Sequence, residues 1–129
     1  MIETPLAVGV DLIEIDRLTP ALGRRGDRFL ERVYTPVEIV HCRGRIPELA
    51  VRFAAKEAVS KALGVGIWWR GGISWTEAEV RSNRLGKPEI RLYGRAADYA
   101  RQQGLDEWAV SLSHSRGHAI AMVVAMRRR

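Results

Sequence analysis

The sequence predicts an α+β fold in which an antiparallel sheet packs against helices. Two observations carry this prediction. Strand-like runs stand near both ends of the chain, and the order along it is strand, helices, strands, helix, strands. A chain of 129 residues is typical of one domain, so residues 1–129 are expected to fold as a single unit.

Two helices are predicted after a first strand at residues 6–11. Apolar residues alternate there with small or polar ones, and the run ends at an acid. Thr19 and Pro20 are typical of a helix start, with a capping Thr and a Pro in the first turn. The stretch TPVE at residues 35–38 has a capping Thr, a first-turn Pro and a Glu at the third helical position. This capping box predicts a short helix that ends before Gly44.

The longest helix is predicted from Pro47 or Glu48 to Gly64. Alanines recur in it at four-residue spacing, and the glycine at its end is a typical stop signal. The glycine-rich segment that follows also holds the paired tryptophans Trp68 and Trp69. We expect it to form a flexible loop.

The C-terminal half is predicted to hold four strands and a helix. Residues 78–82 and 89–93 flank NRLGKP, which is typical of a hairpin turn. Residues 95–103 should be helical and stop at Gly104. Two further strand-like runs, residues 108–113 and 119–125, stand on either side of HSRGH.

The predicted long helix has one small apolar face and one charged face. The small face would let the helix lie very close to a sheet. The charged face holds Arg52, Lys56, Glu57 and Lys61. These charges could simply be solvated, and Glu57 and Lys61 have the i,i+4 spacing that stabilises a helix. Alternatively, one carboxylate among cations suits a phosphate bound with magnesium.

A magnesium site takes one or two protein carboxylates, so a second acid is expected. Asp11 is the candidate, because an acid at the end of an apolar strand can project into a cleft. The other interpretation is an Asp that caps a turn where the strand ends.

Composition narrows the partners without choosing one. The net charge of +6 favours nucleic acid, phosphorylated metabolites, an acidic protein or an acidic membrane surface. The single cysteine, Cys42, excludes a disulfide within the chain. No apolar run approaches the roughly 20 residues that span a bilayer, and the N-terminal stretch lacks the features of a signal peptide. We therefore expect a cytoplasmic protein.

Three stretches together resemble holo-[acyl-carrier-protein] synthase, the small bacterial type of 4′-phosphopantetheinyl transferase. They are GVDLIEIDR (residues 9–17), RFAAKEAVSKALG (residues 52–64) and VSLSH (residues 110–114). DRFLERVYTPVE (residues 27–38) and GKP (residues 86–88) extend the resemblance over most of the chain in the expected order. The KEAxxK motif carries most of its specificity.

The resemblance implies a reaction of fatty acid biosynthesis. The 4′-phosphopantetheine arm of coenzyme A, the co-substrate, moves onto a serine of apo acyl carrier protein, and adenosine 3′,5′-bisphosphate is released. Mg²⁺ is the implied metal. The resemblance also implies the family fold, a homotrimer with sites at subunit interfaces, and no nucleic-acid or membrane partner.

The same resemblance implies roles for single residues. Asp11 and Glu57 match the metal-binding acids, and with Lys61 they would be catalytic. The residues implied for coenzyme A binding are Arg52, Lys61, Gly64, Lys87, Pro88 and His114. The residues implied for docking of the acidic carrier are Arg17, Arg24, Arg28, Phe29 and Arg32. Phe29 would be an apolar anchor in a charged rim, or else it is turned into the core.

Two features depart from the family pattern. Pro20 falls inside the region where the docking helix should run, and the paired tryptophans replace a simpler loop. Two other functions stay open from the residues alone. One is a small basic nucleic-acid-binding domain, and the other is a magnesium-dependent phosphohydrolase. Neither accounts for Asp11 and Glu57 in their motifs.

Overall fold

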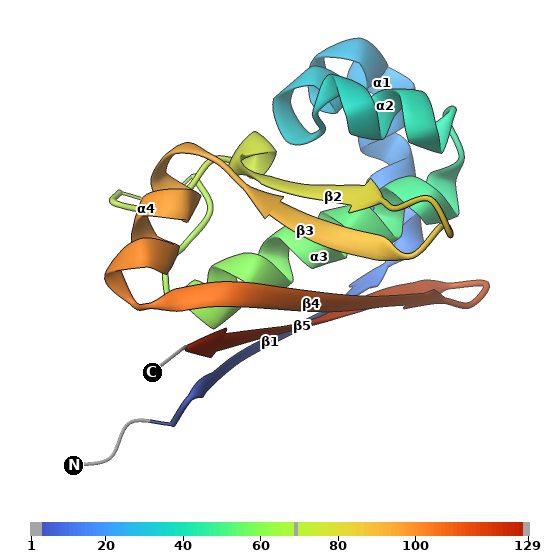
Figure 1. Ribbon diagram of the computed structural model, residues 1–129. Coiled ribbons are helices and arrows are strands. Elements are labelled where there is room, and N and C mark those ends of the chain that lie inside the picture. Colours follow the sequence, from blue (N-terminus) through green and yellow to red (C-terminus); the bar gives the residue numbers. More distant parts are fainter. Residues whose placement is uncertain (1–3, 69, 128–129) are drawn as a thin grey trace.

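The computed structural model describes residues 4–68 and 70–127, apart from the side chains of residues 23–25 (Figure 1). The elements in chain order are β1 (Leu6–Glu14), α1 (Ile15–Val33), α2 (Pro36–Cys42), α3 (Ile46–Leu63), a short 3₁₀ turn (Trp75–Glu77), β2 (Ala78–Ser82), β3 (Pro88–Leu92), α4 (Gly94–Gln102), β4 (Leu105–His114) and β5 (His118–Arg127). The α+β prediction is confirmed.

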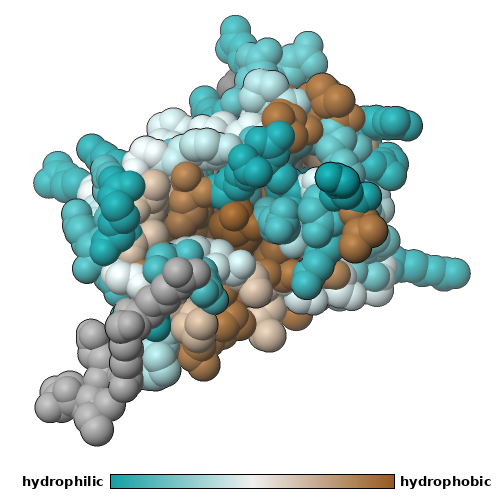
Figure 2. Space-filling view, in the orientation of Figure 1, coloured by the Kyte–Doolittle hydropathy of each residue, from teal (hydrophilic) through white to brown (hydrophobic). Residues whose placement is uncertain are grey.

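The expected antiparallel sheet is present as two sheets. One has the strand order β1-β5-β4, and the other is the β2-β3 hairpin, in which Ser82 stands opposite Pro88. Strands β3 and β4 run side by side, but an apolar groove of about 470 Å³ separates them, lined by residues that include Leu92, Ala97 and Trp108. Figure 2 shows apolar residues gathered in the middle of this face with hydrophilic ones around them.

Helix α3 is the centre of the fold, between the hairpin and the three-stranded sheet (Figure 1). Its alanines are buried, and β1 crosses them at Gly9. A Cβ at Gly9 would lie 1.9 Å from the carbonyl oxygen of Ala58, so only glycine fits there. The close approach predicted from the small face is confirmed. It brings Lys61 of α3 against the backbone of β1, where its Nζ donates to the Val10 carbonyl oxygen.

The structure corrects two predicted boundaries. Strand β1 continues past Asp11 to Glu14, because β5 pairs with it as far as His118. Helix α1 then begins at Ile15 without a break, so Pro20 lies inside the helix and does not start it. A proline there removes one helical hydrogen bond and crowds the carbonyl group four residues earlier.

The local signals elsewhere are confirmed. In α2 the Thr35 hydroxyl accepts from the Glu38 N–H, and the Glu38 carboxylate accepts from the Thr35 N–H at 2.9 Å. Helix α3 ends at Gly64, whose φ of 74° is in the left-handed region that favours glycine. The β2-β3 hairpin and α4 also lie where they were predicted.

The outer face of the three-stranded sheet is apolar and exposed. Its exposed apolar residues include Leu6, Val8, Val10, Leu12, Ile120, Met122 and Met126. Within the described ranges, no helix is long and apolar enough to cross a membrane. An exposed apolar face of this kind is a candidate interaction surface.

Candidate active site

Asp11 and the end of α3 meet where β1 crosses the helix. Lys61 donates from Nζ to Asp11 Oδ1 and to the carbonyl oxygen of Val10, both at 3.1 Å. The structure therefore pairs Lys61 with Asp11 across the fold. Glu57 lies one turn before Lys61 on the same helix, on the side that faces the strand.

The charge of Asp11 acts on Glu57. Partial burial raises the pKa of Glu57, the charge of Asp11 raises it further, and Lys61 lowers it. The second carboxylate oxygen of Asp11, Oδ2, is buried and accepts no hydrogen bond from the described residues. A buried carboxylate oxygen without a partner is costly, and a second acid beside it adds repulsion.

This donor set fits Mg²⁺. The unpartnered Asp11 Oδ2 and the half-buried Glu57 carboxylate offer hard oxygen ligands, and magnesium keeps several waters of its own. No group of three or more His, Cys, Asp or Glu residues that could hold a metal occurs among the described residues. A zinc site, which prefers nitrogen or sulfur ligands, does not fit here.

Lys56 proves to be structural, although it belongs to the charged face predicted from the sequence. It is 0% exposed, and its Nζ donates to Glu38 Oε1 at 2.7 Å. The same ammonium group donates to the carbonyl oxygens of Ala78 at 2.8 Å and Trp75 at 3.1 Å. All three of its N–H bonds are used, so Lys56 has none left for a phosphate.

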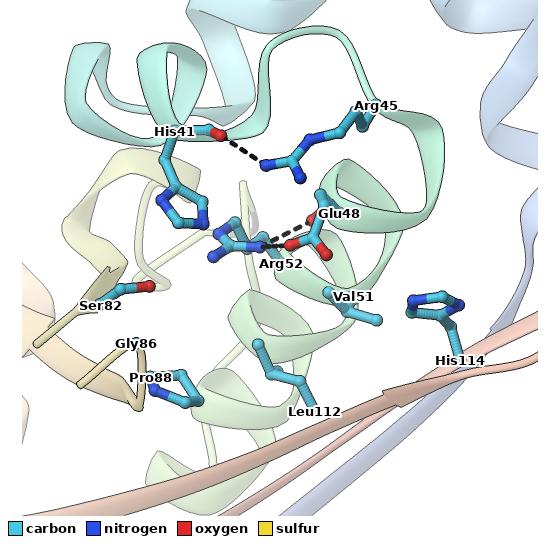
Figure 3. A pocket seen from close by; sticks show the side chains of 10 residues that line it. All are labelled: His41, Arg45, Glu48, Val51, Arg52, Ser82, Gly86, Pro88, Leu112 and His114. Carbon is cyan, nitrogen blue, oxygen red and sulfur yellow. Dashed lines mark hydrogen bonds and ion pairs between the residues drawn. The ribbon is translucent and has the colours of Figure 1, made fainter.

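A pocket of about 410 Å³ opens between the start of α3, the end of β4 and the β2-β3 hairpin (Figure 3). Three residues predicted to bind coenzyme A line it, namely Arg52, Pro88 and His114. Lys87 is exposed in the turn between two lining residues, Gly86 and Pro88. The structure thus brings together residues that are 62 positions apart.

The charged groups in this pocket are held by short hydrogen bonds. Arg52 is only 3% exposed and donates from Nη1 to Glu48 Oε2 at 2.8 Å and to the Glu48 carbonyl oxygen at 3.2 Å. Arg45 donates to the carbonyl oxygens of Cys42 at 2.9 Å and His41 at 2.8 Å. Burial lowers the pKa of His41, and the charge of Arg52 lowers it further.

Four lining residues with polar side chains were not predicted from the sequence. They are His41, Arg45, Glu48 and Ser82. Only the i,i+4 spacing of Glu48 and Arg52 gave a signal in the sequence, since the others come from separate turns of the chain.

The acids and the pocket lie on different sides of α3. Arg52 and Glu57 are five residues apart, which on a helix is about 140° of rotation and about 7.5 Å of rise. Asp11, Glu57 and Lys61 are absent from the pocket lining. Gly64 belongs with them, because it ends the same helix three residues after Lys61. The acids with Lys61 and the Arg52 pocket are therefore two separate features of the chain.

Helix α1 carries the predicted docking residues. Arg17, Arg28 and Arg32 are exposed, and the side chain of Arg24 lies outside the described part. Phe29 is not the projecting anchor. Its ring stacks on Phe53 at 6.3 Å and meets Tyr34 edge-on, because this end of α1 packs against the first half of α3. The alternative, with Phe29 turned onto the core, is what the structure shows.

The loop after α3 exposes Trp68, which has a φ of 58°, and Trp69 lies outside the described residues. The Trp68 N–H donates to the Ile73 carbonyl, and the Ile73 N–H donates to Gly66, both at 2.9 Å. The loop is therefore closed on itself by backbone hydrogen bonds.

Comparison with known proteins gives one consistent result. The family model described as 4′-phosphopantetheinyl transferase superfamily matches residues 7–123. A protein of Herpetosiphon aurantiacus named holo-[acyl-carrier-protein] synthase is 50% identical, over 94% of this chain and 98% of that protein. One of the same name from Geobacter is 47% identical, over 92% of this chain and 96% of that protein.

Solved structures agree. The Helicobacter pylori holo-[acyl-carrier-protein] synthase in complex with coenzyme A superposes with a TM-score of 0.82 at 36% identity, over 92% of this chain and 98% of that one. A second coenzyme A complex, described as from Chronobacterium ammoniagenes, has a TM-score of 0.82 at 33% identity, over 98% of this chain and 100% of that one.

Proposed function

We propose how this chain works from the premise that it belongs to the 4′-phosphopantetheinyl transferase superfamily and is a holo-[acyl-carrier-protein] synthase. It is a transferase whose substrates are coenzyme A and apo acyl carrier protein. The nucleic-acid and phosphohydrolase interpretations are therefore set aside. The observation that carries the proposed site is the meeting of Asp11, Glu57 and Lys61 at the crossing of β1 and α3.

Asp11 and Glu57 are our candidates for holding Mg²⁺. The buried, unpartnered Oδ2 of Asp11 and the raised pKa of Glu57 support this assignment, since a cation would relieve both. When bound, Mg²⁺ would neutralise charge on the pyrophosphate of coenzyme A. Lys61, already beside Asp11, would add a second positive charge to the same phosphates.

The transfer breaks one phosphorus–oxygen bond and forms another. The serine hydroxyl of the carrier attacks the β-phosphorus, and adenosine 3′,5′-bisphosphate leaves with the bridging oxygen. Glu57 is our candidate for taking the serine proton, directly or through a water. Lys61 offsets the charge that builds up on the leaving phosphate.

The pocket around Arg52 is assigned to the nucleotide end of coenzyme A. Since the pyrophosphate belongs beside the acids, the remaining 3′-phosphate is left for Arg52. Pro88 and Leu112 give apolar walls for the adenosine, and His114 lies across the pocket from them. Lys87 would approach the same phosphate from the exposed turn, and Gly64 would leave room for the arm beside Lys61.

The separation of the acids from the Arg52 pocket supports a homotrimer with sites at subunit interfaces. The acids of one chain and the pocket of the same chain face different directions, so a single ligand would reach both only across a boundary between copies. The exposed apolar face of the β1-β5-β4 sheet offers the surface for such a boundary. The molar mass from light scattering tests this assembly.

Arg17, Arg28 and Arg32 are proposed to dock the acidic carrier. They are exposed on one helix, and opposite charge speeds such encounters. Arg24 stays a prediction, as does the cytoplasmic location. Phe29 would support this surface by holding α1 against Phe53.

The activity is tested by the intact mass of an apo acyl carrier protein after incubation with this protein, coenzyme A and Mg²⁺. A gain of about 340 Da, one phosphopantetheine arm transferred as a phosphoryl group, is expected. No gain with several carrier proteins would contradict the assignment. A gain in mass that persists without Mg²⁺ would support the transferase activity but contradict the proposed role of Mg²⁺.

A further inference from the structure

Glu48 is an acid in a pocket assigned to a phosphate. Its Oε2 accepts a hydrogen bond from Arg52 Nη1 at 2.8 Å. Its other carboxylate oxygen points away from Arg52 into the pocket (Figure 3). The proposed reaction and the proposed metal site do not require an acid at this position. Its presence therefore needs an account of its own.

Arg52 is a buried cation of the pocket, and its Nη1 is paired with Glu48. Arg45 is exposed and uses two of its N–H groups on backbone carbonyls, so Arg52 is the pocket cation that Glu48 pairs with. Arg52 cannot turn out to solvent, because its side chain is 3% exposed and fixed on α3. A phosphate that enters the pocket thus meets a guanidinium that already has a carboxylate partner.

Glu48 is the more exposed member of this pair. Its side chain is 30% exposed, against 3% for Arg52. It is also the third residue of α3, where the helix dipole favours a negative charge, so it loses little when it leaves Arg52. The pair can therefore open by a rotation of Glu48 toward solvent.

We propose that Glu48 is a built-in competitor for the 3′-phosphate of coenzyme A. In the empty pocket the Glu48 carboxylate accepts the Arg52 Nη1 hydrogen bond that the phosphate would otherwise accept, and it keeps the guanidinium in position. The ligand phosphate displaces it, and the return of the carboxylate speeds the departure of adenosine 3′,5′-bisphosphate after transfer. This inference rests on the proposed assignment of the Arg52 pocket to the 3′-phosphate.

The test is the affinity of Glu48→Gln for paired ligands with and without the 3′-phosphate. Calorimetric titration uses coenzyme A against 3′-dephospho-coenzyme A, and adenosine 3′,5′-bisphosphate against adenosine 5′-monophosphate. Loss of a half-buried competing charge should tighten the two 3′-phosphorylated ligands by about fivefold. The two ligands without that phosphate should bind as they do to the unaltered protein. Product inhibition should strengthen by the same factor.

Asp98→Asn is the matched control. It removes one negative charge on α4, outside the pocket lining, and should leave all four affinities unchanged. Unchanged thermal unfolding of both variants shows that the fold is retained. Glu48→Ala should repeat the effect of Glu48→Gln if competition, and not the amide, is responsible.

Two results would overturn the inference. Equal tightening of all four ligands would show general repulsion, and weaker binding of the 3′-phosphorylated pair would show that Glu48 only supports Arg52. If the unaltered protein discriminates between neither ligand pair, the pocket assignment itself fails and this inference with it. Transfer activity would still stand in that case, which separates the two failures.

Discussion

Lys61 Nζ lies 3.1 Å from Asp11 Oδ1 and bridges 50 positions of sequence. This contact fixes the last turn of α3 against β1, at the point where Glu57 also faces the strand. It places a cation and two acids together, and the buried Asp11 Oδ2 is left for a further partner.

Glu57→Gln should abolish transfer while the protein stays folded. The amide is a poorer ligand for a hard cation and cannot take a proton, so kcat should fall by at least about a hundredfold. Calorimetric titration should also show weaker binding of Mg²⁺ in the presence of coenzyme A. Asp98→Asn, an acid on α4, is the control. Full activity in Glu57→Gln would remove this residue from the site.

Lys56→Met should destabilise the protein through Glu38. Removal of one partner leaves a fully buried carboxylate unpaired, which costs about 3–5 kcal/mol of unfolding free energy. The double variant with Glu38→Gln should lose less than the sum of the two single variants. Urea unfolding measures all three. If Lys56→Met kept the native stability and lost only nucleotide binding, Lys56 would instead have a role toward the ligand.

Stability should fall as the pH rises above about 9 because of Cys42. Burial raises the pKa of its thiol from 9.0 to about 11. The unfolded chain therefore loses this proton first, and the stabilisation present below pH 9 is lost toward pH 11. Burial also raises the pKa of the Tyr34 hydroxyl, which continues the trend at higher pH.

The measurement is the unfolding free energy of the native protein and of Cys42→Ala across this range. The alanine variant is expected to be less stable throughout, because it leaves a small cavity, but its curve should be flatter between about pH 9 and pH 10. Parallel curves for the two proteins would mean that the thiol does not control the alkaline limit.

Arg28→Glu should raise the Michaelis constant for the carrier by about tenfold or more and leave that for coenzyme A nearly unchanged. The reason is the reversed charge on the exposed face of α1, which would repel an acidic partner. Arg95→Glu makes the same change in net charge on a different helix, α4, and serves as the control (Figure 1). Equal effects on both Michaelis constants would argue against docking on α1.

Local signals in the sequence predicted local structure well. The capping box at Thr35 and the stop at Gly64 depend on neighbouring residues, so they could be found without the fold. The start of α1 could not. Its position follows from the pairing of Glu14 with His118, a contact across 104 positions that overrides the helix signal at Thr19 and Pro20.

The site was predicted in part for the same reason. The motif placed Glu57 and Lys61 on one helix, but nothing in the pattern of α3 showed that Lys56 is buried against Glu38. The pocket residues His41 and Arg45 also escaped detection, because α2, α3, β4 and the hairpin assemble the pocket only after folding.

The central claim is that the acids of one chain work with the Arg52 pocket of another. The most direct measurement mixes two inactive variants, Glu57→Gln and Arg52→Ala, by refolding them together in equal amounts. In a closed trimer with random mixing, about one interface in four joins an intact acid site to an intact pocket, so about a quarter of native activity should return. Activity no greater than that of the separate variants would show that each site lies within a single chain.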